Sequence, residues 1–122
     1  MAHKILVVDD TVDTRDLLHL YLTKAGFTVI IAGDGGEGLY RAKAERPSLI
    51  ITDINMPRLD GISMIRELRA EEETAAVPVI ALTAYGREFR EEAVRVGANA
   101  AKEKPFNFEE LISQVWSLLG QA

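Results

Sequence analysis

Short apolar runs alternate with longer stretches of mixed polarity along this chain. The apolar runs are rich in β-branched residues and lie at residues 5–8, 29–31, 49–51 and 79–82. Such runs are typical of strands that are buried on both faces of a sheet. The longer stretches carry apolar residues at helical spacing, at residues 17–22, 62–68, 89–96 and 108–119. The pattern therefore predicts strands that alternate with amphipathic helices.

A fifth strand is predicted near Ala100-Ala101-Lys102, where the lysine in a short run fits an edge strand. Because strands and helices alternate five times, we expect right-handed βαβ units. They would form an α/β fold of three layers, in which helices cover both faces of a five-stranded parallel sheet. No linker, repeat or low-complexity segment divides the sequence, so a single domain over residues 1–122 is expected.

Five polar side chains lie where the predicted strands end. Asp9 and Asp10 come directly after the first run, Asp53 and Thr83 after the third and fourth, and Lys104 after the fifth strand. In an open parallel sheet, ligands bind outside the carboxyl ends of the strands. We therefore expect three carboxylates, one hydroxyl and one ammonium group in one crevice, a set that suits a divalent metal and a phosphoryl group.

Asp9 and Asp10 need a neutralising partner, because carboxylates a few ångströms apart repel each other. Mg²⁺ is the expected cation, since it takes hard oxygen ligands and often binds together with phosphates. The pair alone leaves a second interpretation open. The two residues could instead cap a helix that begins near Thr11, with Asp10 near the N-cap position.

Asp53 favours the metal and phosphoryl interpretation. A carboxylate at this place can act as a nucleophile and form an acyl phosphate. Such a step needs a metal that neutralises the phosphoryl oxygens. Lys104 offers those oxygens a positive charge and Thr83 offers a hydroxyl donor. The sequence thus predicts phosphoryl transfer to Asp53.

These residues stand in motifs that resemble the receiver domain of two-component response regulators, and the resemblance covers essentially the whole chain. The motifs are ILVVDD at residues 5–10, DINMP at 53–57, DG at 60–61, LTA at 82–84, GA at 97–98 and KPF at 104–106. The resemblance implies a flavodoxin-like fold with strand order 2-1-3-4-5. It also implies a function in phosphorelay signalling.

The resemblance further implies roles for individual residues. Asp53 would be the phosphoacceptor, which takes its phosphoryl group from a phosphohistidine on a sensor histidine kinase or a phosphotransfer protein. The direct Mg²⁺ ligands would be Asp10, Asp53 and the backbone carbonyl of Asn55, with Asp9 acting largely through water. The chain would catalyse its own phosphorylation and slow hydrolysis without being a conventional turnover enzyme.

The kinase would dock beside the site. The expected docking points for its helices are the first helix, around Thr14 and Leu17, and the loop at Pro105-Phe106. In the family the Lys104–Pro105 peptide bond is cis, which aims the lysine inward.

One position departs from the family pattern. Thr83 and Lys104 would detect and hold the phosphoryl group, and an aromatic residue usually stands three positions before the lysine. That aromatic ring swings inward when the threonine moves. Here Ala101 occupies the position, and Lys102 stands where an apolar residue is common. We still expect phosphorylation to move Thr83 and its loop, but with a different readout on the fourth helix and fifth strand.

Two aromatic residues have open roles. Tyr85 and Asn55 could flank the path of a hydrolytic water, or Tyr85 could be a half-exposed loop aromatic. Trp116 is expected to pack in the core or on a helix face.

Three other functions are disfavoured. Gly33, Gly35 and Gly38 fit the G-x-G-x-x-G pattern of a dinucleotide site, but they follow an edge strand, and a glycine-rich turn with Asp34 is the simpler interpretation. An aspartyl-phosphate phosphatase or mutase needs a general acid where this chain has Asn55. A receiver-like module without phosphorylation conflicts with the complete set of site residues.

Composition narrows the partners. The chain has no cysteine, which excludes disulfides and thiolate metal sites, and His3 and His19 are expected in the tail and on a helix surface. The net charge is −5 with dispersed Lys and Arg, and Glu71-Glu72-Glu73 is expected to be a solvated face, so no direct nucleic-acid contact is predicted.

The sequence also sets expectations about location and assembly. It has no secretory signal and no apolar run near 18 residues, so a cytoplasmic location without membrane contact is expected. No effector segment follows Ala122. The downstream effector is therefore expected on another chain or in a missing part of this one. The protein is expected to be a monomer or a phosphorylation-dependent dimer.

Overall fold

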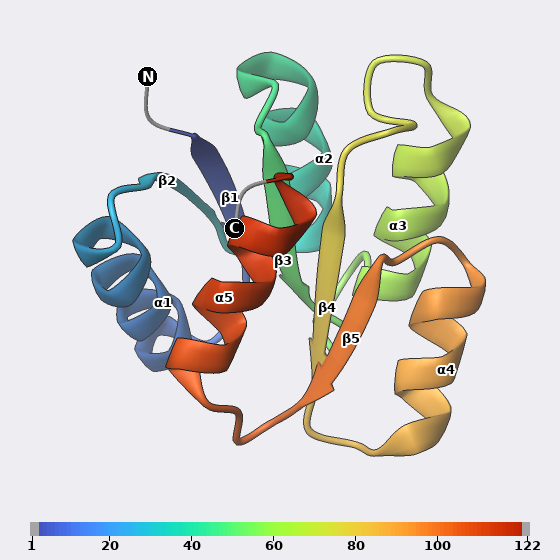
Figure 1. Ribbon diagram of the computed structural model, residues 1–122. Coiled ribbons are helices and arrows are strands. Elements are labelled where there is room, and N and C mark those ends of the chain that lie inside the picture. The colour runs from blue at the N-terminus through green and yellow to red at the C-terminus, as the bar shows by residue number, and fades with distance from the viewer. Residues whose placement is uncertain (1–2, 121–122) are drawn as a thin grey trace.

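The computed structural model describes residues 3–120, in which five strands alternate with five helices (Figure 1). The strands are β1 (Lys4–Val8), β2 (Thr28–Ala32), β3 (Leu49–Asp53), β4 (Val79–Thr83) and β5 (Ala100–Glu103). The helices are α1 (Val12–Lys24), α2 (Gly35–Glu45), α3 (Gly61–Ala70), α4 (Arg87–Arg95) and α5 (Phe108–Leu118). The predicted alternation is confirmed.

The strands form one parallel sheet in the order β2-β1-β3-β4-β5. This is the order that the resemblance implied. β5 is an edge strand, as expected, and its register with β4 places Ala101 beside Ala81. All five strands run toward the same edge of the sheet, the lower edge in Figure 1.

The sheet separates two hydrophobic cores. Ile5 and Val7 of β1 point to the side covered by α1 and α5, whereas Leu6 and Val8 point to the side covered by α2, α3 and α4. These four residues have no exposed surface. Because successive side chains of a strand alternate between faces, a strand that is covered on both sides needs a continuous apolar run.

The apolar stripe on α1 is narrower than the spacing predicts. Leu18 and Leu22 are buried, but Leu17 and Tyr21 are 46% and 41% exposed. The ring of Tyr21 stacks on Phe108 at the start of α5, with ring centroids 4.2 Å apart. These two α1 residues therefore belong to the surface between α1 and α5 and not to the core.

The glycine pattern serves helix packing. Gly35 and Gly38 lie within α2 itself, so the prediction of a glycine-rich turn is wrong for these two residues, whereas Gly33 and Asp34 form a bend and Asp34 is the N-cap residue of the helix. A Cβ atom on Gly38 would lie 2.8 Å from Sδ of Met64 and 3.0 Å from Cγ2 of Val8. Gly38 therefore lets α2 approach β1 and α3 closely.

Arg69 near the end of α3 joins three segments. Its guanidinium group donates hydrogen bonds to the carbonyl oxygens of Gly97 and Val77 and to Oδ1 of Asn99. Asn99 in turn accepts a hydrogen bond from the backbone N–H of Val79. This network fixes the loop before β4 against the loop before β5.

The remaining surface expectations concern single residues. Trp116 packs against Phe27, with ring centroids 4.6 Å apart, and His3 lies edge-on to its ring. His19 is exposed on α1, as expected. The acidic run follows α3, where Glu72 and Glu73 are exposed and Glu71 pairs with Lys43. In the described part of the chain, no helix has the length and apolar character that crossing a bilayer requires.

Candidate functional site

The structure brings the predicted site residues together at one edge of the sheet. Asp9 directly follows β1, Asp53 and Thr83 are the last residues of β3 and β4, and Lys104 directly follows β5. Parallel strands bring these ends to the same edge, although the residues are far apart in sequence. The arrangement confirms the predicted positions at the carboxyl ends of four strands.

Three carboxylates form the centre of the site. Asp9, Asp10 and Asp53 each offer an oxygen, and these atoms lie within 4.8 Å of one another. Asp9 and Asp53 are 1% and 6% exposed, whereas Asp10 is exposed. Two buried carboxylates and a third beside them are stable together only with a positive charge nearby.

Lys104 supplies part of that positive charge. Its Nζ lies 3.2 Å from Oδ2 of Asp9 and 3.5 Å from Oδ1 of Asp53. The Lys104–Pro105 peptide bond is cis, as the resemblance implied. The ammonium group thus bridges the two buried carboxylates.

Asp53 is held in one orientation and resists ionisation. Its Oδ1 accepts a hydrogen bond of 3.0 Å from the backbone N–H of Ile54. Burial is the main cause that raises the pKa of Asp53, the charge of Lys104 lowers it and that of Asp9 raises it, and together these influences bring the pKa to about 6. A further cation in the cluster would favour the ionised carboxylate, which is the form needed for nucleophilic attack.

The start of α1 differs from the capping interpretation. The N-cap residue is Thr11, and its backbone N–H donates a 2.8 Å hydrogen bond to Oδ1 of Asp9. Asp10 therefore lies one residue before the N-cap residue, and the carboxylate that binds the amide at the helix start is that of Asp9. Nη1 of Arg15 also contacts the carbonyl oxygen of Asp9, at 3.4 Å.

Thr83 makes two hydrogen bonds. The side chain is fully buried, and its Oγ1 donates to Oδ1 of Asn55 at 3.2 Å and accepts from the backbone N–H of Tyr85 at 3.0 Å. The Tyr85 ring is 66% exposed, more than the half-exposed ring that was expected. Asn55 is thus joined to Thr83, a contact that the sequence did not predict.

Ala101 leaves a groove beside β5. The groove has a volume of about 410 Å³ and is lined by Arg87, Arg90, Glu91, Val94 and Ala101. No aromatic side chain lines it, and the methyl group of Ala101 packs against the core on the α3 and α4 side. The departure from the family pattern therefore leaves open space next to α4.

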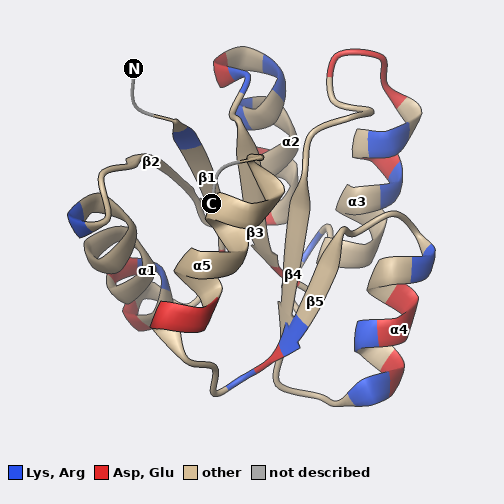
Figure 2. Cartoon of the chain, in the orientation of Figure 1, with Lys and Arg blue, Asp and Glu red and all other residues tan. Residues whose placement is uncertain are grey.

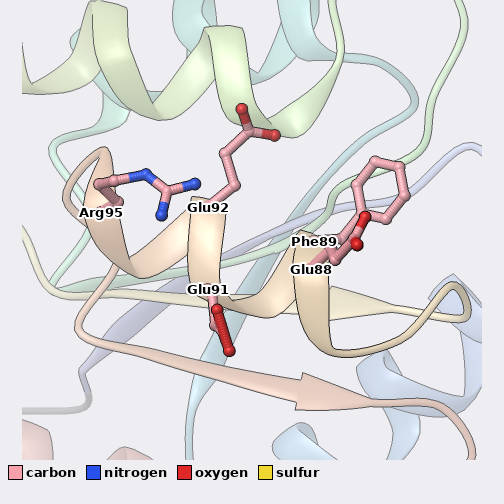
Figure 3. Close-up of a pocket in the computed structure, with 5 residues that line it drawn as sticks. All are labelled: Glu88, Phe89, Glu91, Glu92 and Arg95. Atoms are coloured by element: carbon pink, nitrogen blue, oxygen red, sulfur yellow. The ribbon is translucent and has the colours of Figure 1, made fainter.

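Another hollow on α4 lies apart from the site. It is lined by Glu88, Phe89, Glu91, Glu92 and Arg95, and Figure 3 shows Glu91 pointing away from Glu92 and Arg95. Positively and negatively charged residues are interspersed along α4 (Figure 2). None of the predicted site residues lines this hollow.

The geometry agrees with comparisons to known proteins. The family model of the response regulator receiver domain matches residues 5–116. The chain belongs to this family. It is therefore a receiver domain of two-component phosphorelay signalling, a family whose members work with histidine kinases and downstream effectors.

Relatives of this receiver domain differ in length. It is 42% identical over 120 residues to a probable transcriptional regulator of Porphyra purpurea, matching 98% of this chain but 48% of that protein. It is 38% identical over 119 residues to a probable chemotaxis protein of Rhizobium etli, matching 96% of this chain and 92% of that protein. The chain thus spans about half the length of the transcriptional regulators that it matches.

A solved structure adds information on the metal. The receiver domain of a sensor histidine kinase from Pseudomonas aeruginosa superimposes with a TM-score of 0.92 at 33% identity, covering 99% of this chain and 100% of that one. A magnesium ion is coordinated in the active-site cleft of that protein. In this chain, the three clustered carboxylates offer the hard oxygen ligands that such an ion prefers.

Proposed function

We propose that this receiver domain accepts a phosphoryl group on Asp53 from a phosphohistidine and later loses it by hydrolysis. The supporting observation is the buried Asp53 carboxylate, which lies in one cluster with Asp9, Asp10 and Lys104. The phosphohistidine belongs to a sensor histidine kinase or to a phosphotransfer protein. The domain promotes this transfer to itself and is not a conventional turnover enzyme.

The chemistry is a displacement at phosphorus. A carboxylate oxygen of Asp53 attacks the phosphorus, the P–N bond breaks, and its electron pair returns to the imidazole, which takes up a proton from solvent. Lys104 holds the oxygens of the transferred group by charge, and the Thr83 hydroxyl donates to one of them. In hydrolysis, water attacks the phosphorus, the P–O bond to Asp53 breaks, and inorganic phosphate leaves.

A magnesium ion fits the donor set at this place. The carboxylates of Asp10 and Asp53 and the backbone carbonyl of Asn55 would hold it, with Asp9 acting largely through water. When bound, such an ion neutralises the negative charge that builds up on the phosphoryl oxygens. The chain's own residues hold the acceptor in place, because Oδ1 of Asp53 is fixed by the Ile54 amide.

The test uses acetyl phosphate as the donor and intact mass as the readout. Wild type with Mg²⁺ is expected to gain one phosphoryl group, whereas Asp53→Asn and wild type with EDTA are not. Asp16→Asn removes an exposed carboxylate on α1 and is the matched control, which should be phosphorylated normally. An equal adduct on Asp53→Asn would place the acceptor elsewhere.

The kinase docks at a groove between α1 and the β5–α5 loop. The groove has a volume of about 360 Å³ and is lined by Thr14, Leu17, Lys104, Pro105, Phe106 and Phe108. Its lining is mostly apolar, and it includes the lysine of the site. A helix that lies in this groove would therefore bring its phosphohistidine near Asp53.

Leu17→Asp tests this docking surface. The rate of phosphoryl transfer from a phosphorylated kinase domain is expected to fall at least tenfold in this variant. The reason is that the new carboxylate would be buried against the partner's apolar helix in the complex. Its phosphorylation by acetyl phosphate should stay normal. Leu20→Asp is the matched control, since Leu20 is 47% exposed on the same helix and does not line the groove. Equal losses in both variants would contradict the docking site.

Phosphorylation acts on the effector by population shift. The acyl phosphate stabilises the conformation in which Thr83 reaches the phosphoryl group, and an effector that prefers this conformation binds more tightly. The effector is a separate protein or a further domain, since the matched transcriptional regulator of Porphyra purpurea is covered to only 48% of its length. The domain is a monomer or dimerises on phosphorylation, which sedimentation with and without beryllofluoride measures.

A further inference from the structure

We propose that the side chain of Asn55 restrains Thr83 in the resting protein and competes with the phosphoryl group for its hydroxyl proton. This inference rests on the proposed function, because it assigns a regulatory role at the same site. Asn55 is therefore a positioning residue that acts through Thr83. Its backbone carbonyl would bind Mg²⁺, whereas its side chain binds the Thr83 hydroxyl.

The first support is the hydrogen-bond capacity of a hydroxyl group. Thr83 has one O–H donor, and in this structure it is directed to Oδ1 of Asn55 at 3.2 Å. The Thr83 side chain is fully buried, so its hydroxyl would be costly to leave without an acceptor. Thr83 can donate to a phosphoryl oxygen only after the bond to Asn55 breaks.

The second support is the connection between this bond and the loop before α4. Oγ1 of Thr83 also accepts a hydrogen bond of 3.0 Å from the backbone N–H of Tyr85. Gly86 follows with a φ of 95° and is the N-cap residue of α4. The bond to Asn55 therefore restrains Thr83 and, through the Tyr85 amide, the loop that leads into α4.

The third support is that none of the residues lining the groove between β5 and α4 is aromatic. Ala101 stands beside Ala81, and the groove between β5 and α4 has no aromatic side chain in its lining. An aromatic ring in this space would pack differently before and after the loop that follows Thr83 moves, and would therefore contribute its own preference for one conformation. Arg87, Arg90, Glu91 and Val94 line the groove beside Ala101 instead. Without such a ring, the hydrogen bond from Thr83 to Asn55 acts directly on the residue that has to move.

Beryllofluoride, which stands in for the phosphoryl group, provides the binding test. Its affinity is measured by calorimetry at saturating Mg²⁺ for wild type, Asn55→Ala, Thr83→Val and the double variant. Removal of the competing acceptor is expected to tighten binding about three- to tenfold in Asn55→Ala, the factor that corresponds to one net hydrogen bond. In the Thr83→Val background, the same substitution should have no effect, because no hydroxyl is left to compete for.

This pattern separates the restraint from a purely structural role. If Asn55→Ala weakens binding, or changes it equally with and without the Thr83 hydroxyl, the inference is wrong. Ser63→Ala is the matched control, because Ser63 shares the neighbouring groove with Asn55. It should leave the affinity unchanged.

A second measurement needs no phosphoryl mimic. Three-bond NMR couplings report the χ1 rotamer of Thr83, which is expected to be single in wild type and averaged in Asn55→Ala. One unchanged rotamer in the variant would overturn the inference. Failure of wild type to bind beryllofluoride would instead refute the proposed function, and the couplings would still decide whether Asn55 restrains Thr83.

Discussion

Removal of the Asp53 charge should stabilise the metal-free protein. The pKa of this carboxyl is raised from its ordinary 3.8 to about 6, mainly by burial. Each pKa unit corresponds to about 1.4 kcal/mol, so the ionised group lowers the free energy of unfolding by roughly 3 kcal/mol above pH 7. Asp53→Asn keeps the shape of the side chain and removes the charge. We therefore expect the variant to be more stable than wild type by about 2–3 kcal/mol at pH 7.5.

The sign follows from proton binding. The folded protein binds the Asp53 proton more tightly than the unfolded chain does, because the folded pKa is the higher one. Through this group, wild type gains stability as the pH falls from above 6 toward 4. The advantage of Asp53→Asn should therefore be complete above pH 7 and should disappear near pH 4.

Urea unfolding in EDTA measures this difference at pH 7.5, 6 and 4. Asp16→Asn controls for the loss of one exposed negative charge and should match wild type within about 0.5 kcal/mol. Mg²⁺ should raise the free energy of unfolding of wild type, because it binds the folded protein. It should raise that of Asp53→Asn much less. An advantage for Asp53→Asn that is equal at pH 7.5 and pH 4, or that is absent at pH 7.5, would refute the reasoning about burial.

Two further predictions concern helix starts. Gly61→Ala should lower the free energy of unfolding by about 2–4 kcal/mol, measured by thermal unfolding, because its Cβ would lie 2.8 Å from Cα of Ile54 and backbone atoms yield less readily than a side chain. Gly36→Ala is the control and should cost little, because its Cβ meets only a side-chain oxygen. Equal losses of stability in the two variants would contradict the clash at Gly61. Asp34→Ala should cost about 1 kcal/mol at pH 7, because the carboxylate caps α2 through the Glu37 amide. That hydrogen bond lowers the pKa of Asp34. The loss of stability in Asp34→Ala should therefore shrink as the pH falls through and below 4, where the wild-type carboxylate becomes protonated. A loss that does not change with pH would show that the charge of Asp34 plays no part.

The sequence predicted those parts of the fold that depend on local pattern. Strands buried on both faces must be apolar throughout, so the runs that became β1, β3 and β4 could be recognised. α2 has no comparable apolar stripe, because glycines form much of its buried face. The role of Gly38 depends on Met64 and Val8, whose proximity only the folded chain reveals.

The candidate site divides in a similar way. Carboxylates, a hydroxyl and a lysine at strand ends are visible in the sequence, because parallel strands bring their ends to one edge. The hydrogen bond between Thr83 and Asn55 depends on side-chain directions, which no spacing encodes. The Arg69 network is likewise hidden, since a single arginine on a helix surface resembles any solvated cation.

The two cores lie on opposite sides of the sheet and separate the groove proposed for the kinase from the loop proposed to respond to phosphorylation. The groove proposed for the kinase is built from α1 and the segment that leads into α5, on one side of the sheet. The loop after Thr83 leads to α4, on the other side. The two surfaces share none of their lining residues. If both proposals hold, we expect substitutions on α1 to redirect the domain to a different kinase while α4 stays intact, and substitutions on α4 to change the effector while the kinase is kept.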